Sequence, residues 1–123
     1  MVASVRLGDD AANGRLLRIF LGEDDRVAGV PAARAVVELA RQLGMAGATV
    51  LRGSLGYGAN SAIHRPEPWR LSGDLPVVIE IVDREDRIDA LLTQLESRLE
   101  GGGLITVETV RVLRYQGGDA ADG

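Results

Sequence analysis

The segment Pro76-Val-Val-Ile-Glu-Ile-Val-Asp83 decides how this chain folds, because it is the clearest strand in the sequence and follows its longest polar stretch. Before it, Ala48-Thr-Val-Leu-Arg52 is a second strand pattern, which leads directly into Gly53 and residues 54–75. The chain therefore leaves one strand, makes a long excursion and returns in the next. Connections longer than about 12–15 residues are uncommon in compact domains unless they bind something or are disordered.

One helix and the first strand are expected before these two strands. The first strand covers residues 15–21 and ends at Gly22. A helix is expected over residues 31–43, where apolar residues recur at helical spacing between a proline and Gly44. Its apolar positions are Ala33, Val36, Val37, Ala40 and Leu43.

A second helix and a last strand follow. Asp83 is expected to cap this helix at its N-terminus, and two acidic residues in its first turn suit the helix dipole. Its apolar stripe consists of Ile88, Leu91, Leu92, Leu95 and Leu99. Glycines 101–103 then stop the helix, and the last strand is expected over 104–113, with a β-bulge near Thr109 where the alternation changes phase.

The order of these elements is βαββαβ. Right-handed crossovers fold this order into an α+β, ferredoxin-like domain, in which a four-stranded antiparallel sheet carries both helices on one face. We expect a single domain over residues 15–115, with flexible tails at 1–14 and 116–123 and a long excursion at 57–74.

The two faces of the central strands differ in composition. One face is wholly apolar and should meet the helices; it carries Leu17, Ile19, Leu21, Val77, Ile79 and Ile81. The other carries Leu16, Arg18, Phe20, Val78, Glu80 and Val82, which is too apolar for a face left entirely in water. We expect another copy of the chain to cover it, with Arg18 paired to Glu80 across the strands. The alternative is an ordinary half-exposed sheet face.

Composition excludes several classes of protein. The net charge is −4 and all 14 basic residues are Arg, which argues against binding nucleic acid or anionic lipid through broad electrostatics. The absence of Cys excludes thiolate zinc sites, thiol catalysis and disulfides, and a reducing cytoplasm is the expected location. Apolar runs are too short to span a membrane, so no insertion is expected.

Two groups of glycines are candidate anion-binding elements. Gly53, Gly56 and Gly58 follow a strand directly, and their backbone N–H groups can form a nest for a phosphate. The alternative is that they permit a sharp bend at the base of the excursion. Gly101, Gly102 and Gly103 have an equally good alternative as a helix stop and turn.

Three residues of the excursion are candidates for contact with a partner protein. Tyr57 and Trp69 are two of only four aromatic residues, and such side chains often anchor interfaces; the alternative is that Trp69 packs on its own subunit. His64 is the single histidine; a general base, a pH sensor and an anion contact are open roles for it, and the alternative is that it anchors the excursion through a hydrogen bond. One His with scattered carboxylates forms no recognisable metal site.

The sequence contains no recognisable set of catalytic residues, so we expect a protein that is not an enzyme. The sequence has no Ser-His-acid order and no carboxylate pair set apart by its environment. RNA-binding domains of this strand order need stacking aromatics on the central strands, and 76–83 has none. A ligand-binding domain of the amino-acid-sensing type, or an enzyme with no recognisable catalytic set, remains an alternative.

An ordered set of segments resembles one family. It includes 17–23, 47–53, 56–61, Ile63-His64, 71–72, 74–83 and 102–108. Together they resemble the bacterial and archaeal proteins grouped as domain of unknown function 190, which are related to PII-like signalling proteins. In the place of the Lys-containing PII nucleotide signature, this chain has Glu100-Gly-Gly-Gly-Leu104.

The resemblance implies a PII-type homotrimer that binds a small anionic effector, such as an adenine nucleotide, in the clefts between subunits. The ligand-binding residues it implies are Arg52, Gly53, Gly56, Gly58, Asn60, Ser61, Arg65, Gly101, Gly102 and Gly103. It also implies that the excursion corresponds to the PII T-loop and contacts a partner such as a membrane transporter, a channel or an enzyme. Tyr57, His64 and Trp69 are the partner-binding candidates.

Overall fold

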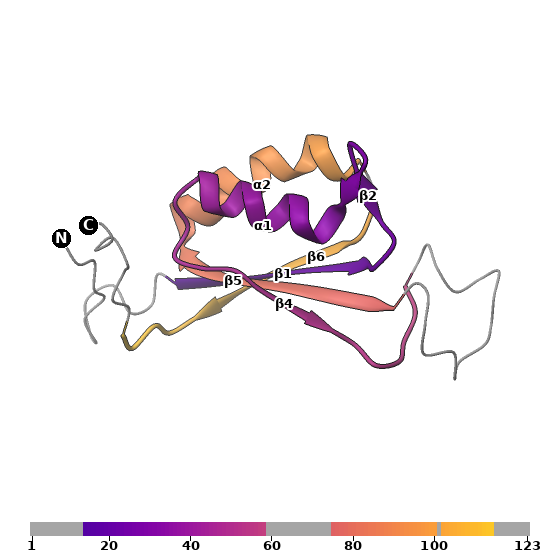
Figure 1. Cartoon of the computed structure of the whole chain (residues 1–123). Coiled ribbons are helices and arrows are strands. Elements are labelled where there is room, and N and C mark those ends of the chain that lie inside the picture. The colour runs from indigo at the N-terminus through magenta and orange to yellow at the C-terminus, as the bar shows by residue number, and fades with distance from the viewer. Residues whose placement is uncertain (1–13, 59–74, 101, 115–123) are drawn as a thin grey trace.

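A computed structural model describes residues 14–58, 75–100 and 102–114 (Figure 1). One antiparallel sheet has the strand order β4-β5-β1-β6. Its strands are β1 (Gly14–Gly22), β4 (Thr49–Arg52), β5 (Pro76–Arg84) and β6 (Leu104–Val110). The helices α1 (Ala32–Gln42) and α2 (Glu85–Leu99) lie side by side on one face of this sheet. The α+β, ferredoxin-like fold predicted from the sequence is therefore confirmed.

The core lies between the sheet and the two helices. The predicted inner face of β1 and β5 is confirmed, because all six of its side chains are at most 6% exposed. From α2, the buried residues are Ile88, Leu91 and Leu95, while Leu92 and Leu99 are partly buried against the core. Removing these apolar surfaces from water is the main source of stability for such a domain.

Helix α1 differs slightly from its predicted stripe. Its buried residues are Ala32, Val36, Leu39 and Ala40, so Ala32 and Leu39 join the core although the pattern left them out, whereas Val37 does not belong to it. The helix ends as predicted before Gly44, which adopts a left-handed φ of 74°.

The start of α2 contradicts the predicted cap. Asp83 belongs to β5, and Arg84 stands in the N-cap position without a side-chain cap. The Asp83 carboxylate instead accepts hydrogen bonds from the backbone N–H of Arg84 at 2.8 Å and of Ala46 at 2.9 Å. It therefore ties the segment before β4 to the start of α2. At the other end, Glu100 rather than a glycine takes the left-handed C-cap conformation.

The edges of the sheet also correct the prediction. Strand β6 pairs with β1 in an unbroken register from Leu104 to Val110, so the bulge predicted near Thr109 does not form. The strand ends at Val110 and not at residue 113. Gly14, predicted to lie in a tail, is the first residue of β1 and pairs with Val110 and Arg84.

A small hairpin between β1 and α1 was not predicted. Strands β2 (Arg26–Val27) and β3 (Val30–Pro31) pair antiparallel around a two-residue turn. Both turn residues, Ala28 and Gly29, have positive φ, at 51° and 86°. Two-residue hairpin turns of this kind match the twist of the strands and usually carry Asn-Gly, Asp-Gly or Gly-Gly, so Ala28-Gly29 matches that signal only at its second position.

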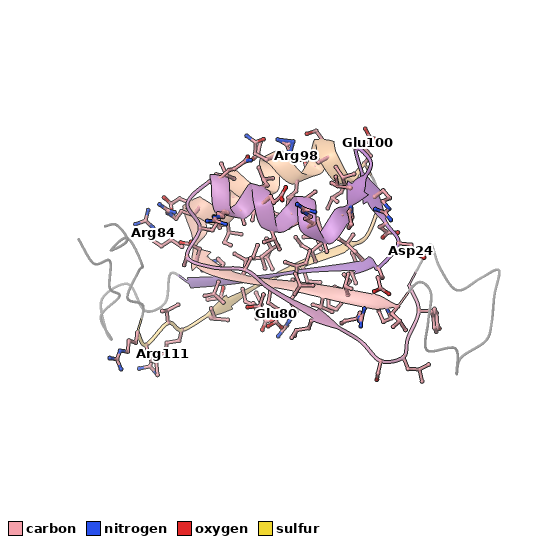
Figure 2. All side chains as sticks on the ribbon, in the orientation of Figure 1. Asp24, Glu80, Arg84, Arg98, Glu100 and Arg111 are labelled. Atoms are coloured by element: carbon pink, nitrogen blue, oxygen red, sulfur yellow. The ribbon has the colours of Figure 1, made fainter. Side chains whose placement is uncertain are left out.

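The face of the sheet opposite the helices is partly exposed and largely apolar. We call it the open face, and it consists of Leu16, Arg18, Phe20, Thr49, Leu51, Val78, Glu80, Val82, Leu104, Thr106 and Glu108. Leu51 and Leu104 are 50% and 59% exposed, and Phe20 is 36% exposed. Figure 2 shows Glu80 on this side of the sheet, away from the helices.

An ion-pair cluster occupies the middle of the open face. The Arg18 guanidinium lies 3.0 Å from a carboxylate oxygen of Glu80 and 3.0 Å from one of Glu108. The pairing of Arg18 with Glu80 predicted from the sequence is confirmed within one chain. The hydrogen bond to Glu80, with the charge of both carboxylates, raises the pKa of Arg18 above its ordinary value, so it stays protonated.

Candidate functional site at the glycine end of the sheet

Those of the sequence-selected residues that the structure describes lie at one end of the sheet. There β1 and β4 finish while β5 and β6 begin (Figure 1). The described candidate glycines lie in the turns that follow β4 and precede β6, and we call this end the glycine end. Asp24, after β1, and Glu100, after α2, lie at the same end (Figure 2).

The first glycine turn follows β4 and packs against the start of β5. The Gly53 N–H donates to the Pro76 carbonyl at 2.8 Å. A Cβ added to Gly53 would lie 2.9 Å from the Pro76 ring, and one added to Gly56 would lie 3.1 Å from it, where φ is already +152°. Both glycines therefore allow the chain to turn closely over Pro76. For Gly53 and Gly56, this supports the alternative interpretation of the sequence, a bend at the base of the excursion.

Arg52 is held by an acidic neighbour. Its guanidinium donates to the Glu23 carboxylate at 2.6 Å, and their side chains are 62% and 33% exposed. Glu23 is fixed in turn, because its backbone N–H donates to the Leu75 carbonyl at 2.7 Å and extends the pairing of β1 with β5. An anion that binds Arg52 must therefore share it with Glu23 or displace Glu23.

The second glycine turn joins α2 to β6. The Gly102 N–H donates to the Leu99 carbonyl at 2.8 Å. Gly103 has a φ of +83°, and a Cβ there would lie 2.7 Å from the Leu21 side chain and 2.9 Å from the Phe20 carbonyl. Both the positive φ and the lack of space for a Cβ require glycine at this position. The second turn is thus fixed against the end of β1.

Within one chain, the two glycine turns do not converge. One lies beyond β4 and the other beyond β6, and these are the opposite edges of the sheet. Three strand spacings separate the edges, about 14 Å at the usual distance between strands. The turns share one end of the molecule without forming a common site in a single subunit.

A cavity of about 160 Å³ opens beside the second turn. It lies between the end of β1, the β2–β3 hairpin, the start of α1 and the end of α2. The residues around it are Leu21, Asp25, Arg26, Val27, Ala32, Leu99 and Gly102. Of these, only Gly102 was a sequence candidate.

Sequence reasoning missed the acidic residues that organise this end. Asp25 accepts the Gly22 N–H on its carboxylate at 2.8 Å, donates its own N–H to the Gly22 carbonyl at 3.1 Å, and accepts the Ala32 N–H on its carbonyl at 2.7 Å. It thereby builds the connection from β1 into the hairpin and α1. A polar Glu-Asp-Asp run after a strand is the signal that marks such a turn.

The remaining candidates divide into two groups. Tyr57 is 80% exposed, as an interface residue must be in the free protein, and a Cβ added to Gly58 would have no atom within 4 Å. Asn60, Ser61, His64, Arg65, Trp69 and Gly101 lie outside the described residues. Over the described ranges, His and acidic side chains form no cluster suited to a metal ion. No helix in these ranges is long and apolar enough to cross a membrane.

Comparison with other proteins identifies relatives along nearly the whole chain. The model of the family DUF190, described as "Uncharacterized ACR", matches residues 14–112. A UPF0166 protein of Aquifex aeolicus is 39% identical over 99 residues, covering 80% of this chain and 92% of that protein. A UPF0166 protein of Methanocaldococcus jannaschii is 33% identical over 100 residues, covering 81% and 92%.

A solved structure shares the fold. CPII from Thiomonas intermedia K12, a nitrogen regulatory PII-like protein bound to ADP, AMP and bicarbonate, superposes with a TM-score of 0.57. The match covers 91% of this chain and 96% of CPII, at 16% sequence identity. The likeness at this identity is one of fold, and it confirms the PII-like architecture implied by the resemblance.

Proposed function

This chain belongs to the DUF190 family, and on that basis we propose that it is a PII-like regulatory protein which assembles as a homotrimer and binds a small anionic effector between subunits. The proposed effector class is the adenine nucleotides, since CPII, which shares the fold, binds ADP and AMP. We place its action in the cytoplasm. There the segment 57–74 would contact a partner such as a transporter, a channel or an enzyme.

The placement of the two glycine turns carries this proposal. They lie on opposite edges of one sheet but at the same end of it. In a closed ring of identical subunits, each subunit presents one surface to a different surface of the next. If the β4 edge of one subunit adjoins the β6 edge of its neighbour, the turn at Gly53 and Gly56 meets the partner's turn at Gly102 and Gly103. The site is complete only in the assembly.

The open face supports the same arrangement. Its apolar side chains need a cover, and its central charges are already neutralised in part by the pairing of Arg18 with two carboxylates. Burying a paired charge is much less costly than burying an isolated one. Sister subunits around a threefold axis would cover this face with the same surface from each copy.

Charge at the cleft favours an anion. Arg52 supplies a guanidinium beside the first glycine turn, and its planar fork suits two oxygens of a phosphate. The glycine backbone allows a phosphate to approach closely because no Cβ obstructs it. Arg65, Asn60 and Ser61, in the segment outside the described residues, are proposed to complete the contacts.

Two measurements test the proposal together. Sedimentation equilibrium at micromolar concentration is expected to give three times the mass of one chain. Calorimetric titration with ATP, ADP, AMP and cyclic nucleotides is expected to show saturable binding of at least one of them. A monomer would remove the shared cleft from the proposal. A trimer that binds none of these compounds would exclude the adenine nucleotides as its effectors.

A further inference from the structure

The ion-pair cluster on the open face carries unequal numbers of positive and negative charges. The Arg18 guanidinium donates from Nε to Glu80 and from Nη1 to Glu108, at 3.0 Å in each case. A guanidinium has five N–H donors, so it can hold both carboxylates by hydrogen bonds. Its single positive charge neutralises only one of them. Each subunit therefore keeps one excess negative charge in the middle of this face.

The other described residues of the open face do not compensate the excess charge. Outside the cluster, the four strands contribute only uncharged side chains to this face: Leu16, Phe20, Thr49, Leu51, Val78, Val82, Leu104 and Thr106. The arginines at the ends of β4 and β5 are engaged with other acids, Arg52 with Glu23 and Arg84 with Asp86. Arg111 follows the end of β6 (Figure 2). The excess is thus a property of the face as a whole.

Assembly changes the surroundings of this charge. In the single chain the side chains of Arg18, Glu80 and Glu108 are 35%, 34% and 59% exposed, so water screens the excess. In the proposed trimer the same face of each subunit is covered by its sisters, and the three clusters lose water together. Three guanidinium groups then face six carboxylates. Three excess negative charges around one axis repel one another more strongly as water is removed.

Protonation relieves this repulsion without disturbing the fold. Arg18 stays charged, because the hydrogen bond to Glu80 and the charges of both carboxylates raise its pKa. The change must therefore occur on the acidic side of the cluster. Two carboxylates that share a site away from water favour the uptake of one proton. A protonated carboxyl group also gains a donor, which can bridge to a neighbouring carboxylate.

We propose that subunits take up protons at the ion-pair cluster when they assemble, so that the trimer is favoured as pH falls. The sign follows from linkage, because the state that binds more protons is stabilised in acid. This inference rests on the proposed trimer and adds to it a control of assembly by pH. Since the proposed effector cleft is complete only between subunits, the same control extends to effector binding.

Sedimentation velocity of the full chain, in dilution series at fixed ionic strength, measures the effect. The series covers about pH 5.5 to about pH 8.5, where folded domains are usually most stable, and circular dichroism checks the fold at each pH. The association constant for three subunits is expected to rise with falling pH by about tenfold per pH unit for each proton taken up. If the trimer is too tight to dissociate on dilution, exchange of subunits between tagged and untagged trimers is expected to slow as pH falls.

Substitutions assign the effect to the cluster. Glu108→Gln leaves equal numbers of positive and negative charges, so it is expected to strengthen assembly at about pH 8 by about tenfold or more and to remove most of the pH dependence. Arg18→Gln increases the excess and should weaken assembly most in alkaline solution. Glu96→Gln is the matched control, because it removes the same charge from an exposed position of α2, on the other side of the sheet. It should assemble like the natural protein.

The possible failures of these tests can be told apart. A trimer whose association constant and exchange rate do not change with pH would overturn the control by pH and leave the proposed trimer intact. A pH dependence that persists in Glu108→Gln would overturn it as well, and would assign the effect to another group such as His64, the single histidine. A monomer at every pH would exclude the trimer itself, and this inference with it.

Discussion

The pair of Arg52 and Glu23 links the charge of the candidate site to the fold. Their atoms lie 2.6 Å apart, and Glu23 is anchored to Leu75 through its backbone. In the free protein, Glu23 pairs with the guanidinium of Arg52, which is the group that we propose binds the effector. A phosphate of the effector therefore competes with the Glu23 carboxylate for Arg52. Breaking the pair of Arg52 and Glu23 costs free energy, and this cost weakens the binding of the effector.

Removing the competitor should strengthen binding. The substitution Glu23→Gln is expected to raise the affinity for ADP by about 1.4- to fivefold, since exposed ion pairs contribute about 0.2–1 kcal/mol. Glu38→Gln, which breaks the exposed pair of Arg34 and Glu38 on α1, is the matched control and should leave the affinity unchanged. Calorimetric titration measures both. Equal affinities in the two variants would show that Glu23 does not restrain the effector site.

Gly103 tests how tightly the second glycine turn is fixed. Gly103→Ala is expected to lower the free energy of unfolding by about 1–3 kcal/mol, because it combines a left-handed φ with close contacts to Leu21 and to the Phe20 carbonyl. Gly47→Ala is the control, since nothing lies within 4 Å of a Cβ there. Urea unfolding compares the two variants. Equal stability would mean that the turn relaxes freely.

The start of α2 is tied to a loop that lies far away in the sequence. Asp83 in β5 accepts the Ala46 N–H, and Arg87 in the first turn donates to the Gly44 carbonyl at 2.6 Å. Both bonds connect the start of α2 to the loop between α1 and β4. This loop is thereby held at the end of the sheet opposite the glycine end.

The first turn of α2 also predicts a dependence of stability on pH. The side-chain hydrogen bond from Arg84 lowers the pKa of Asp86. Because this pKa is lower in the folded chain, the carboxylate stabilises the fold above its unfolded pKa of about 4 and loses that effect as pH falls through the folded value.

Asp86→Asn measures this effect. Near neutral pH the variant is expected to unfold at lower urea concentration than the natural protein, and the difference should disappear in acid below the folded pKa. Asp89→Asn, at an exposed position one turn further along α2, removes a charge without breaking the Arg84 contact and is the matched control. A difference for Asp86→Asn that persists unchanged in acid would show that the Arg84 contact does not matter.

The molecule as a whole has one covered and one uncovered sheet face. The covered face makes a core that is complete in one chain, whereas the open face leaves Phe20, Leu51 and Leu104 in contact with water. The same surface is what a ring of identical subunits would bury. In the proposed trimer, folding of the chain and assembly therefore depend on opposite faces of the sheet.

A charge on the open face should separate assembly from folding. Phe20→Glu is expected to give a monomer that retains its circular dichroism spectrum, because the position is partly exposed in a single chain but lies in the proposed seam. Ala90→Glu, on the exposed side of α2, should keep the assembly state of the natural protein. Sedimentation velocity distinguishes them. A Phe20→Glu variant that assembles like the natural protein would place the seam elsewhere.

Residue patterns were sufficient for the architecture. The order of the elements, the inner face of β1 and β5, and the pairing of Arg18 with Glu80 follow from periodicity and alternation, because burial of one face imposes a repeat on the sequence. The end of α1 at Gly44 was predicted for a local reason, a left-handed residue that favours glycine. These features depend on neighbours in sequence or on a repeating pattern.

Contacts between segments far apart in the sequence could be identified only from the tertiary structure. Asp83 resembles a helix cap in sequence, but β5 continues past it and its carboxylate turns to Ala46, 37 positions earlier. Glu23 reaches Arg52 only because β1 and β4 end at the same side of the sheet. The cavity between Asp25, Arg26 and Leu99 likewise arises where the hairpin meets the end of α2. Periodic patterns in the sequence do not indicate such contacts, since the contacts depend on how elements far apart in the chain pack together.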